Sequence, residues 1–186
     1  MRFSPLKIHG AWLIELEPHT DIRGSFARTF CAREFAARGL VSVFPQHSRS
    51  RNVRKGTLRG MHYQRAPHAE VKLVSCTQGR VFDVCLDLRP ASSTFLEWHG
   101  VDLSADNGRQ LYIPEGCAHG FQSLTAKSEV TYRISTFYEP SAATGVRYDD
   151  PVFGIDWPLP AASMSERDLS WPDFQPGSTD FKSSAS

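Results

Sequence analysis

Short segments rich in Val, Ile, Phe and Tyr recur along the chain, and turn-forming residues separate them. The sequence holds 12 prolines and 13 glycines, so each apolar run ends after a few residues. The segments that predict strands are Val71–Cys76, Arg80–Leu88, Phe95–Leu103, Arg109–Pro114 and Glu129–Thr136. Turn signals at such intervals are typical of a sandwich or barrel. We therefore predict an all-β core, built as a double-sheet jelly roll.

Two short helices are expected at the periphery of this core. Cys31–Gly39 is rich in Ala and Arg, which favour helix, and Gly39 is a suitable C-terminal stop. A second helical turn is expected near Ser163–Asp168. A length of 186 residues suits one domain. We expect this domain to span residues 1–176 and residues 177–186 to form a polar tail.

Charge and composition exclude several classes of function. The chain has 21 Lys and Arg against 20 Asp and Glu, so no net positive field attracts nucleic acid or membrane. It has no apolar run of signal-peptide or membrane-spanning length. The four cysteines show no disulfide spacing, and no phosphate-binding or nicotinamide-binding glycine motif occurs. These features predict a cytoplasmic protein with reduced thiols.

One pair of predicted strands allows a register to be counted. Val71–Cys76 and Arg80–Leu88 are separated by Thr77–Gly79, which predicts a hairpin. Because side chains alternate along a strand, Lys72 and Asp83 would share one sheet face in either of two registers. By itself, this pattern favours an exposed cross-strand ion pair of little energetic value.

Three residues stand out as candidates for chemistry, each with a structural alternative. His62 lies in LRGMHYQ, and Gly60 occupies the place where a metal-binding HxH motif would have its first histidine, which disfavours a metal site. His119 lies between glycines that allow close backbone approach, in a hairpin corner or a site. Tyr132 is predicted to point inward, where its hydroxyl needs a partner. That hydroxyl is either a structural hydrogen bond or a proton donor.

The motifs taken together are far more specific than each alone. DIRGSF, KGTLRGMHYQ, EVKLVSCTQGRVFDVCLDLR, YIPEGCAHGFQSL, VTYRISTFYEP, VRYDDPVFGIDWP and SERD occur in this order. The chain resembles the dTDP-4-dehydrorhamnose 3,5-epimerase family, whose members are sugar-nucleotide epimerases with a cupin-like jelly roll. This resemblance implies a homodimer that needs no cofactor and no metal. It also implies a nucleotide-linked 4-keto-6-deoxy sugar as substrate, with dTDP as the expected nucleotide.

The resemblance assigns roles to four residues. His62 matches the base that abstracts a proton, and Asp168 matches the carboxylate that orients it. Lys72 matches the lysine near the sugar's C4 oxygen, and Tyr132 matches the acid that returns a proton from the opposite face. These types suit the chemistry, because a C4 ketone acidifies the hydrogens at C3 and C5 and inversion needs a second acid.

The resemblance also assigns residues that bind the substrate. Arg59 matches an arginine that binds the phosphates, and Asp83 lies beside Lys72. The full set of expected binding residues is Arg23, Phe26, Gln46, Ser48, Arg59, Asp83, His119, Tyr138 and Arg167. Many members carry acidic residues where this chain has Arg28 and Ala143, at positions that border the ligand.

Other functions remain open at the level of sequence. A relative that inverts only C3, or that isomerises the keto position, would keep His62 and Tyr132. A catalytically inactive sugar-nucleotide binding module could use the same barrel, although the presence of both residues and of Asp168 argues against it. A metal-dependent cupin is disfavoured by the missing HxH motif. Alternating apolar residues in Ala11–His19 favour an edge strand that pairs in a homodimer.

Overall fold

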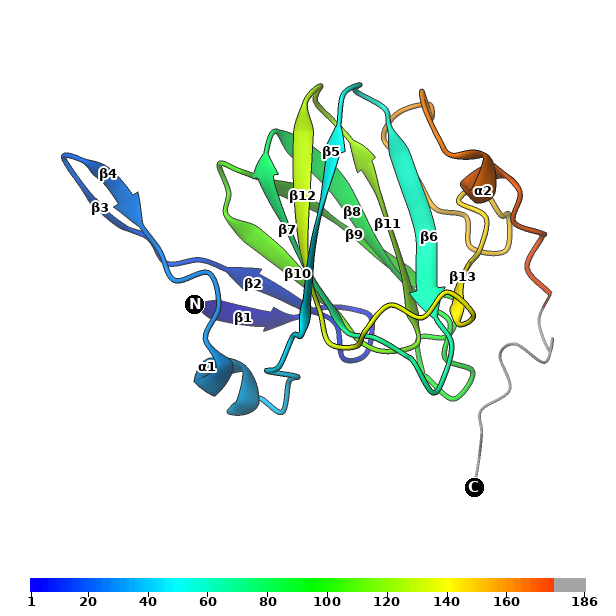
Figure 1. Cartoon of the computed structure of the whole chain (residues 1–186), viewed down its shortest axis with the longest axis horizontal. Coiled ribbons are helices and arrows are strands. Elements are labelled where there is room, and N and C mark those ends of the chain that lie inside the picture. The colour runs from blue at the N-terminus through cyan, green and yellow to red at the C-terminus, as the bar shows by residue number, and fades with distance from the viewer. Residues whose placement is uncertain (176–186) are drawn as a thin grey trace.

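Two antiparallel sheets face each other in the computed structural model, which describes residues 1–175 (Figure 1). The six-stranded sheet has the order β1 (Arg2–Pro5), β2 (Trp12–Glu15), β10 (Arg109–Ile113), β7 (Lys72–Gln78), β12 (Ser128–Ile134), β5 (Gln46–Asn52). The five-stranded sheet has the order β13 (Ala143–Gly145), β6 (Leu58–Gln64), β11 (Cys117–Ser123), β8 (Arg80–Asp87), β9 (Trp98–Ser104). This architecture confirms the predicted jelly roll. The expected tail at 177–186 lies outside the described residues.

The main core fills the space between the two sheets. Val74 and Val130 enter it from the six-stranded sheet, and Val81 and Phe121 enter it from the five-stranded sheet. Two further apolar clusters cover the outer faces of the sheets. Side chains that point outward from the strands are therefore buried as well as those that point inward. Burying each side chain of this size contributes about 1.5–3 kcal/mol to the stability of the fold.

Both predicted helices are present, in shortened form. α1 (Ala32–Ala36) begins after Cys31, and the chain leaves the helix through Gly39 at a φ of 70°. Phe35 of α1 is fully buried against the outer face of the six-stranded sheet, which explains why the helix docks there. α2 (Glu166–Leu169) begins after Ser165, whose side chain accepts a hydrogen bond from the backbone N–H of Asp168. This cap fixes the place of the Asp168 side chain.

The predicted pairing of β7 with β8 is wrong. β7 pairs with β10 and β12, whereas β8 pairs with β9 and β11. The turn at Gly79 therefore carries the chain from one sheet to the other. Both hydrogen-bonding edges of each strand are used by other partners, and such long-range pairing cannot be counted from a local turn. Lys72 and Asp83 consequently point into the space between the sheets from opposite sides.

The strand predicted within Ala11–His19 is also not an edge strand. β2 pairs with β1 on one side and with β10 on the other, so the alternating apolar residues of Ala11–His19 are satisfied within the chain. Ile14 is fully buried. The edge of this sheet is β1, so β2 offers no free edge through which a second copy could pair.

A two-stranded hairpin projects from the body of the molecule (Figure 1). It consists of β3 (His19–Asp21) and β4 (Gly24–Phe26). Ile22 at its tip and Phe26 near its base are both largely exposed. Elsewhere in residues 1–175, no helix is long and apolar enough to cross a membrane, and the four cysteines are free thiols.

Candidate active site

Two glycines bring β6 and β11 unusually close together. A Cβ atom on Gly60 would lie 2.5 Å from the Cα atom of Gly120, and Gly60 has a φ of 132°. Only glycine fits such an approach. His62 then pairs with His119 across the two strands. His119 is thus inside a central strand and not at a hairpin corner, and cross-strand partners place their side chains on one face.

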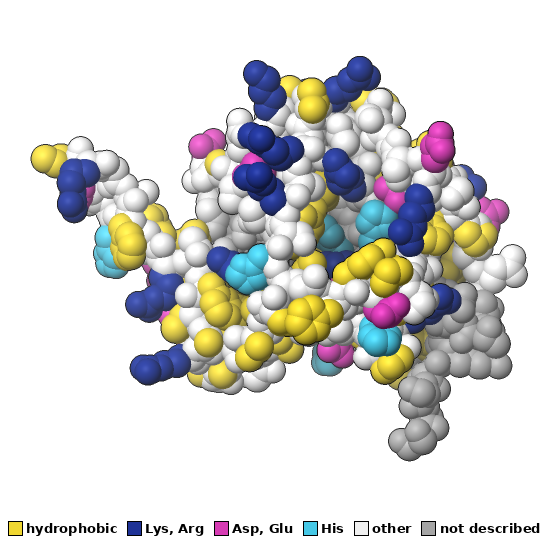
Figure 2. Space-filling view, viewed as in Figure 1, with side chains coloured by type: hydrophobic (Ala, Val, Ile, Leu, Met, Phe, Trp, Pro, Cys, Tyr) yellow, Lys and Arg dark blue, Asp and Glu magenta, His cyan; other side chains and the backbone are white. Residues whose placement is uncertain are grey.

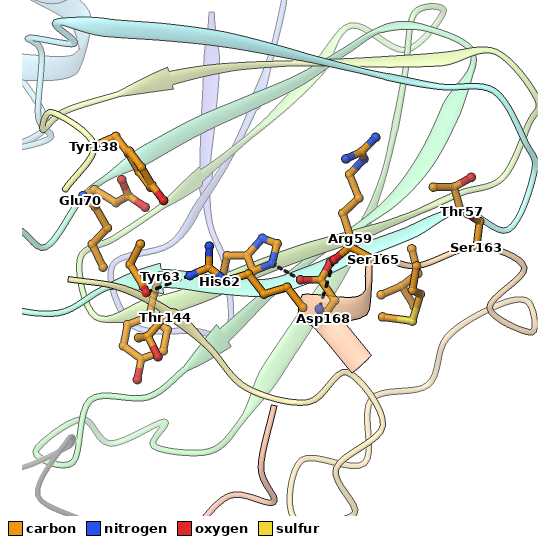
Figure 3. Close-up of a pocket in the computed structure, with 15 residues that line it drawn as sticks. Thr57, Arg59, His62, Tyr63, Glu70, Tyr138, Thr144, Ser163, Ser165 and Asp168 are labelled. Atoms are coloured by element: carbon orange, nitrogen blue, oxygen red, sulfur yellow. Dashed lines mark hydrogen bonds and ion pairs between the residues drawn. The ribbon is translucent and has the colours of Figure 1, made fainter. Parts of the chain in front are cut away.

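His62 and Asp168 form a hydrogen-bonded pair (Figure 3). The Nε2 atom of His62 lies 2.6 Å from a carboxylate oxygen of Asp168. The other carboxylate oxygen accepts a bond from the backbone N–H of Gly60 at 3.4 Å. Burial pushes the pKa of Asp168 upward, but the bonds from His62 and Gly60 outweigh it and hold the pKa below its ordinary value. Asp168 is therefore ionised at neutral pH and fixes the orientation of the imidazole.

The pair opens onto a pocket of about 410 Å³. Five of the expected site residues line it: Arg59, His62, Tyr138, Arg167 and Asp168. Figure 3 shows His62 between Asp168 on one side and Glu70 and Tyr138 on the other. The pocket therefore gathers, within one cavity, residues that are more than a hundred positions apart in the chain.

Lys72 is held beside His62 by two acceptors. Its Nζ atom donates to the backbone carbonyl of His62 at 3.1 Å and lies 2.9 Å from the carboxylate of Glu70. Both side chains of the ion pair are nearly buried. Glu70 was not among the residues predicted from the sequence, although its position two residues before Lys72 places both on one side of an extended chain. Glu70 supplies the negative charge that a buried ammonium needs.

A second histidine–carboxylate pair lies between the sheets. The Nε2 atom of His119 is 2.9 Å from one oxygen of Asp83, and Asp83 is fully buried. Its other oxygen has no hydrogen-bond partner among the described residues. Burial raises the pKa of Asp83, while His119 and Lys72 act in the opposite direction. The expected exposed ion pair between Lys72 and Asp83 is therefore wrong, because both side chains are buried.

Tyr132 reaches the same interior from the opposite sheet. It packs against the core as predicted, with its ring edge-on to His119 at 5.8 Å between centroids. Its hydroxyl forms a hydrogen bond of 3.2 Å with Ser50. Burial raises the pKa of this hydroxyl, so the tyrosine is protonated at neutral pH. His62 lies on the five-stranded sheet and Tyr132 on the six-stranded sheet, so the imidazole and the phenol enter the interior from opposite sides.

The remaining expected binding residues fall into two groups. Gln46 and Ser48 lie on β5, where the Gln46 side chain accepts from the backbone N–H of Tyr138 and Ser48 pairs with Tyr132. Arg23 and Phe26, in contrast, lie on the projecting hairpin (Figure 1). The structure does not bring these two to the pocket of their own chain.

Of the two positions that depart from the family pattern, one lines the pocket and the other does not. Ala143 lines the pocket, and its carbonyl accepts from the Arg167 side chain at 3.0 Å. Arg28 lies outside it and contacts Glu34 at 3.4 Å. Among residues 1–175, no group of three or more His, Cys, Asp or Glu side chains is placed to hold a metal ion.

Comparison with known proteins gives a consistent result over nearly the whole chain. A family model described as dTDP-4-dehydrorhamnose 3,5-epimerase matches residues 5–176. The enzyme of that name from Methanothermobacter thermautotrophicus is 44% identical over 173 residues, which cover 91% of this chain and 92% of the relative.

Two solved structures extend this similarity to the fold. A dTDP-6-deoxy-D-glucose-3,5-epimerase from Legionella pneumophila, in complex with dTDP-4-keto-L-rhamnose, is 36% identical with a TM-score of 0.86 and coverage of 94% and 98%. A 3′-monoepimerase from Streptomyces bikiniensis, in complex with dTDP-quinovose, is 34% identical with a TM-score of 0.84 and coverage of 91% and 85%. With the jelly roll, the motif order and these matches in agreement, the chain belongs to the dTDP-4-dehydrorhamnose 3,5-epimerase family of isomerases.

Proposed function

We propose that this protein inverts C3 and C5 of a dTDP-linked 4-keto-6-deoxy sugar, in the biosynthesis of deoxysugars or cell-surface polysaccharides. The observation that carries the proposal is the placement of the His62–Asp168 pair and Tyr132 on opposite sheets. Inversion at carbon requires one group to remove a proton and another to return one from the other face. An acid and a base on one face could only exchange the proton.

The first step is proton abstraction by His62. Because its Nε2 faces the ionised Asp168, the neutral ring carries its proton on Nε2 and presents the Nδ1 lone pair as base. Nδ1 takes the proton from C3 or C5, and the electrons of the C–H bond move to form an enolate at the C4 oxygen. Asp168 stabilises the imidazolium that results. The Lys72 ammonium stabilises the enolate oxygen.

The second step is reprotonation by Tyr132. The phenol O–H bond breaks as the enolate electrons form a new C–H bond on the opposite face of the ring. Imidazolium and phenolate are then reset by losing one proton to solvent and gaining one from it, so the enzyme is unchanged. Repeating the two steps at the other carbon gives the doubly inverted sugar.

Positively charged side chains near the site support a substrate that is bound through a nucleotide diphosphate. Figure 2 shows histidine side chains in a hollow of this face, with lysine and arginine side chains around it. Arg59 and Arg167 line the pocket, whereas Arg49 and Arg51 lie on the outer face of β5 and pair with Glu129. Guanidinium groups bind phosphate oxygens in a planar, bidentate manner.

Incubation with dTDP-4-keto-6-deoxyglucose in heavy water tests the proposal. We expect NMR to show deuterium at both C3 and C5 together with inverted product, before and after treatment of the protein with EDTA. Deuterium and inversion at C3 alone would instead support the second candidate, a C3 epimerase, which the similarity to the 3′-monoepimerase favours. Binding without any exchange would indicate a non-catalytic module. Activity that EDTA removes and a metal restores would contradict the metal-independent mechanism.

We further propose that the protein is a homodimer in which the hairpin of one copy completes the pocket of the other. Arg23 and Phe26 are expected to contact the nucleotide, yet their hairpin projects away from the body of their own chain (Figure 1). An isolated two-stranded hairpin is only marginally stable in water. Its exposed Ile22 and Phe26 would gain burial against a second copy.

Mixed dimers test this arrangement directly. Arg23→Ala and His62→Ala chains, each expected to have little or no activity alone, are co-expressed with different tags and purified as the mixed species. A mixed dimer holds one pocket with both His62 and a partner hairpin carrying Arg23, so we expect activity well above either parent. If the hairpin serves its own chain, no intact pocket exists and activity stays at the parental level. Light scattering that gives 20.8 kDa, the mass of one chain, would contradict the dimer itself.

A further inference from the structure

We propose that Ser50 is a positioning residue for the reaction, which aims the Tyr132 hydroxyl at the sugar and supports the phenolate that forms. This inference rests on the proposed role of Tyr132 as the acid. Ser50 lies on β5, the edge strand next to β12, and its Oγ atom is 3.2 Å from the Tyr132 hydroxyl. Ser50 is not among the site residues predicted from the sequence.

The hydrogen-bonding capacity of the two hydroxyls sets the direction of this bond. A tyrosine hydroxyl has one hydrogen to donate, and in the proposed mechanism that hydrogen points to the substrate carbon. The bond with Ser50 must then run from the serine O–H to the tyrosine oxygen. Such a bond restricts the rotation of the phenol O–H and leaves its hydrogen free to face the sugar.

The surroundings of Tyr132 make this bond important once the proton has left. Burial disfavours the phenolate, and the nearby negative charge of Asp83 adds to the effect, while Ser50 and the charge of Arg59 oppose it. The neighbouring His119 ring meets Tyr132 edge-on, and its Nε2 is already engaged with Asp83. Ser50 is thus the hydrogen-bond donor that the described part of the chain provides to the phenolate oxygen.

The place of Ser50 on a strand also keeps its hydrogen bond to the Tyr132 hydroxyl in a fixed geometry. On β5 it pairs with Val130, two residues before Tyr132 on β12, so both side chains project from the same face of the sheet. Rigid strands hold a bond more precisely than loops do. The serine is half-buried at the sheet edge, where its oxygen can accept from water while its hydrogen is donated to Tyr132.

Ser50→Ala tests the inference in the heavy-water assay. The variant loses a hydrogen bond to the charged phenolate, so we expect the rate of inversion to decrease by roughly 10- to 100-fold. Deuterium exchange, which needs only His62, should decrease much less, and Ser50→Thr, which keeps the hydroxyl, should restore much of the inversion rate. The matched control is Ser75→Ala, the same change on β7, which flanks β12 on the side opposite β5 and where Ser75 pairs with Thr131. We expect wild-type inversion from this control.

A double-mutant cycle separates the positioning role from other roles. In a Tyr132→Phe background, Ser50→Ala should have no further effect, because the hydroxyl that it positions is gone. A further decrease there, or wild-type inversion in Ser50→Ala alone, would overturn the inference. If Ser50→Ala does not fold, Ser50→Cys is used instead, because its S–H is only a weak donor. The same decrease in inversion is expected for it, and the same results would overturn the inference. Wild-type inversion by Tyr132→Phe would instead remove the proposed role of the tyrosine.

Discussion

His62→Ala is expected to abolish both deuterium exchange and product formation while the protein stays folded. Loss of a general base typically costs about 10²–10⁴-fold in rate. The side chain is partly exposed and faces the pocket, so its removal leaves no cavity in the core. Exchange at C3 and C5 in heavy water measures the effect, and circular dichroism checks the fold. Wild-type exchange at both carbons would show that another group is the base.

Asp168→Asn is the matched comparison for this variant. The amide is almost the same size as the carboxylate, but it can offer its N–H to the ring and favour the wrong tautomer. We expect substrate affinity to be retained and the rate of exchange to fall, because the Asp168 carboxylate is bonded to His62 and to the backbone N–H of Gly60. A normal rate with weaker binding would place Asp168 among the binding residues.

The strands themselves could be predicted because their signals are local. Val71–Cys76, Arg80–Leu88 and Glu129–Thr136 match β7, β8 and β12 to within about two residues, since alternation and turn residues are read over short windows. The helix at Cys31–Gly39 was also visible, from Ala content and a terminal glycine. Each of these features depends on residues that are neighbours in the chain.

The pairing of strands could not be predicted in the same way. A turn of one residue between β7 and β8 suggests a hairpin, yet the chain uses it to change sheets. The deciding interactions are with β10, β12, β9 and β11, which follow later in the chain. Likewise, β1 covers the edge of β2, which alternation alone presented as an unpaired edge.

The site shows the same division between local pattern and long-range contact. The glycines on either side of His119 indicated close backbone approach, and the structure places Gly120 against Gly60. The family resemblance, not spacing, connected His62 with Asp168. Ser50 and Glu70 carried no signal of their own, because a serine in a polar strand and a glutamate near a lysine are ordinary surface features. Their importance follows only from what they contact.

Tyr132→Phe is expected to separate the two halves of the reaction. The phenyl ring still packs against the core and His119, so the fold loses little more than the bond to Ser50. His62 can still remove a proton and return one to the same face, so deuterium exchange should survive in part. Inverted product should fall by about 10²–10⁴-fold, the usual contribution of a general acid.

The ratio of exchange to inversion is the decisive quantity, because it is independent of how much enzyme is active. In the wild type, enolate formed by His62 is captured by Tyr132 from the other side. In Tyr132→Phe the same enolate has only His62 to protonate it, so the ratio should rise steeply. If exchange and inversion fall together, Tyr132 positions the sugar and does not protonate it. If inversion continues at the wild-type rate, Tyr132 is a core residue, and Tyr138, which lines the pocket beside Glu70, becomes the candidate acid.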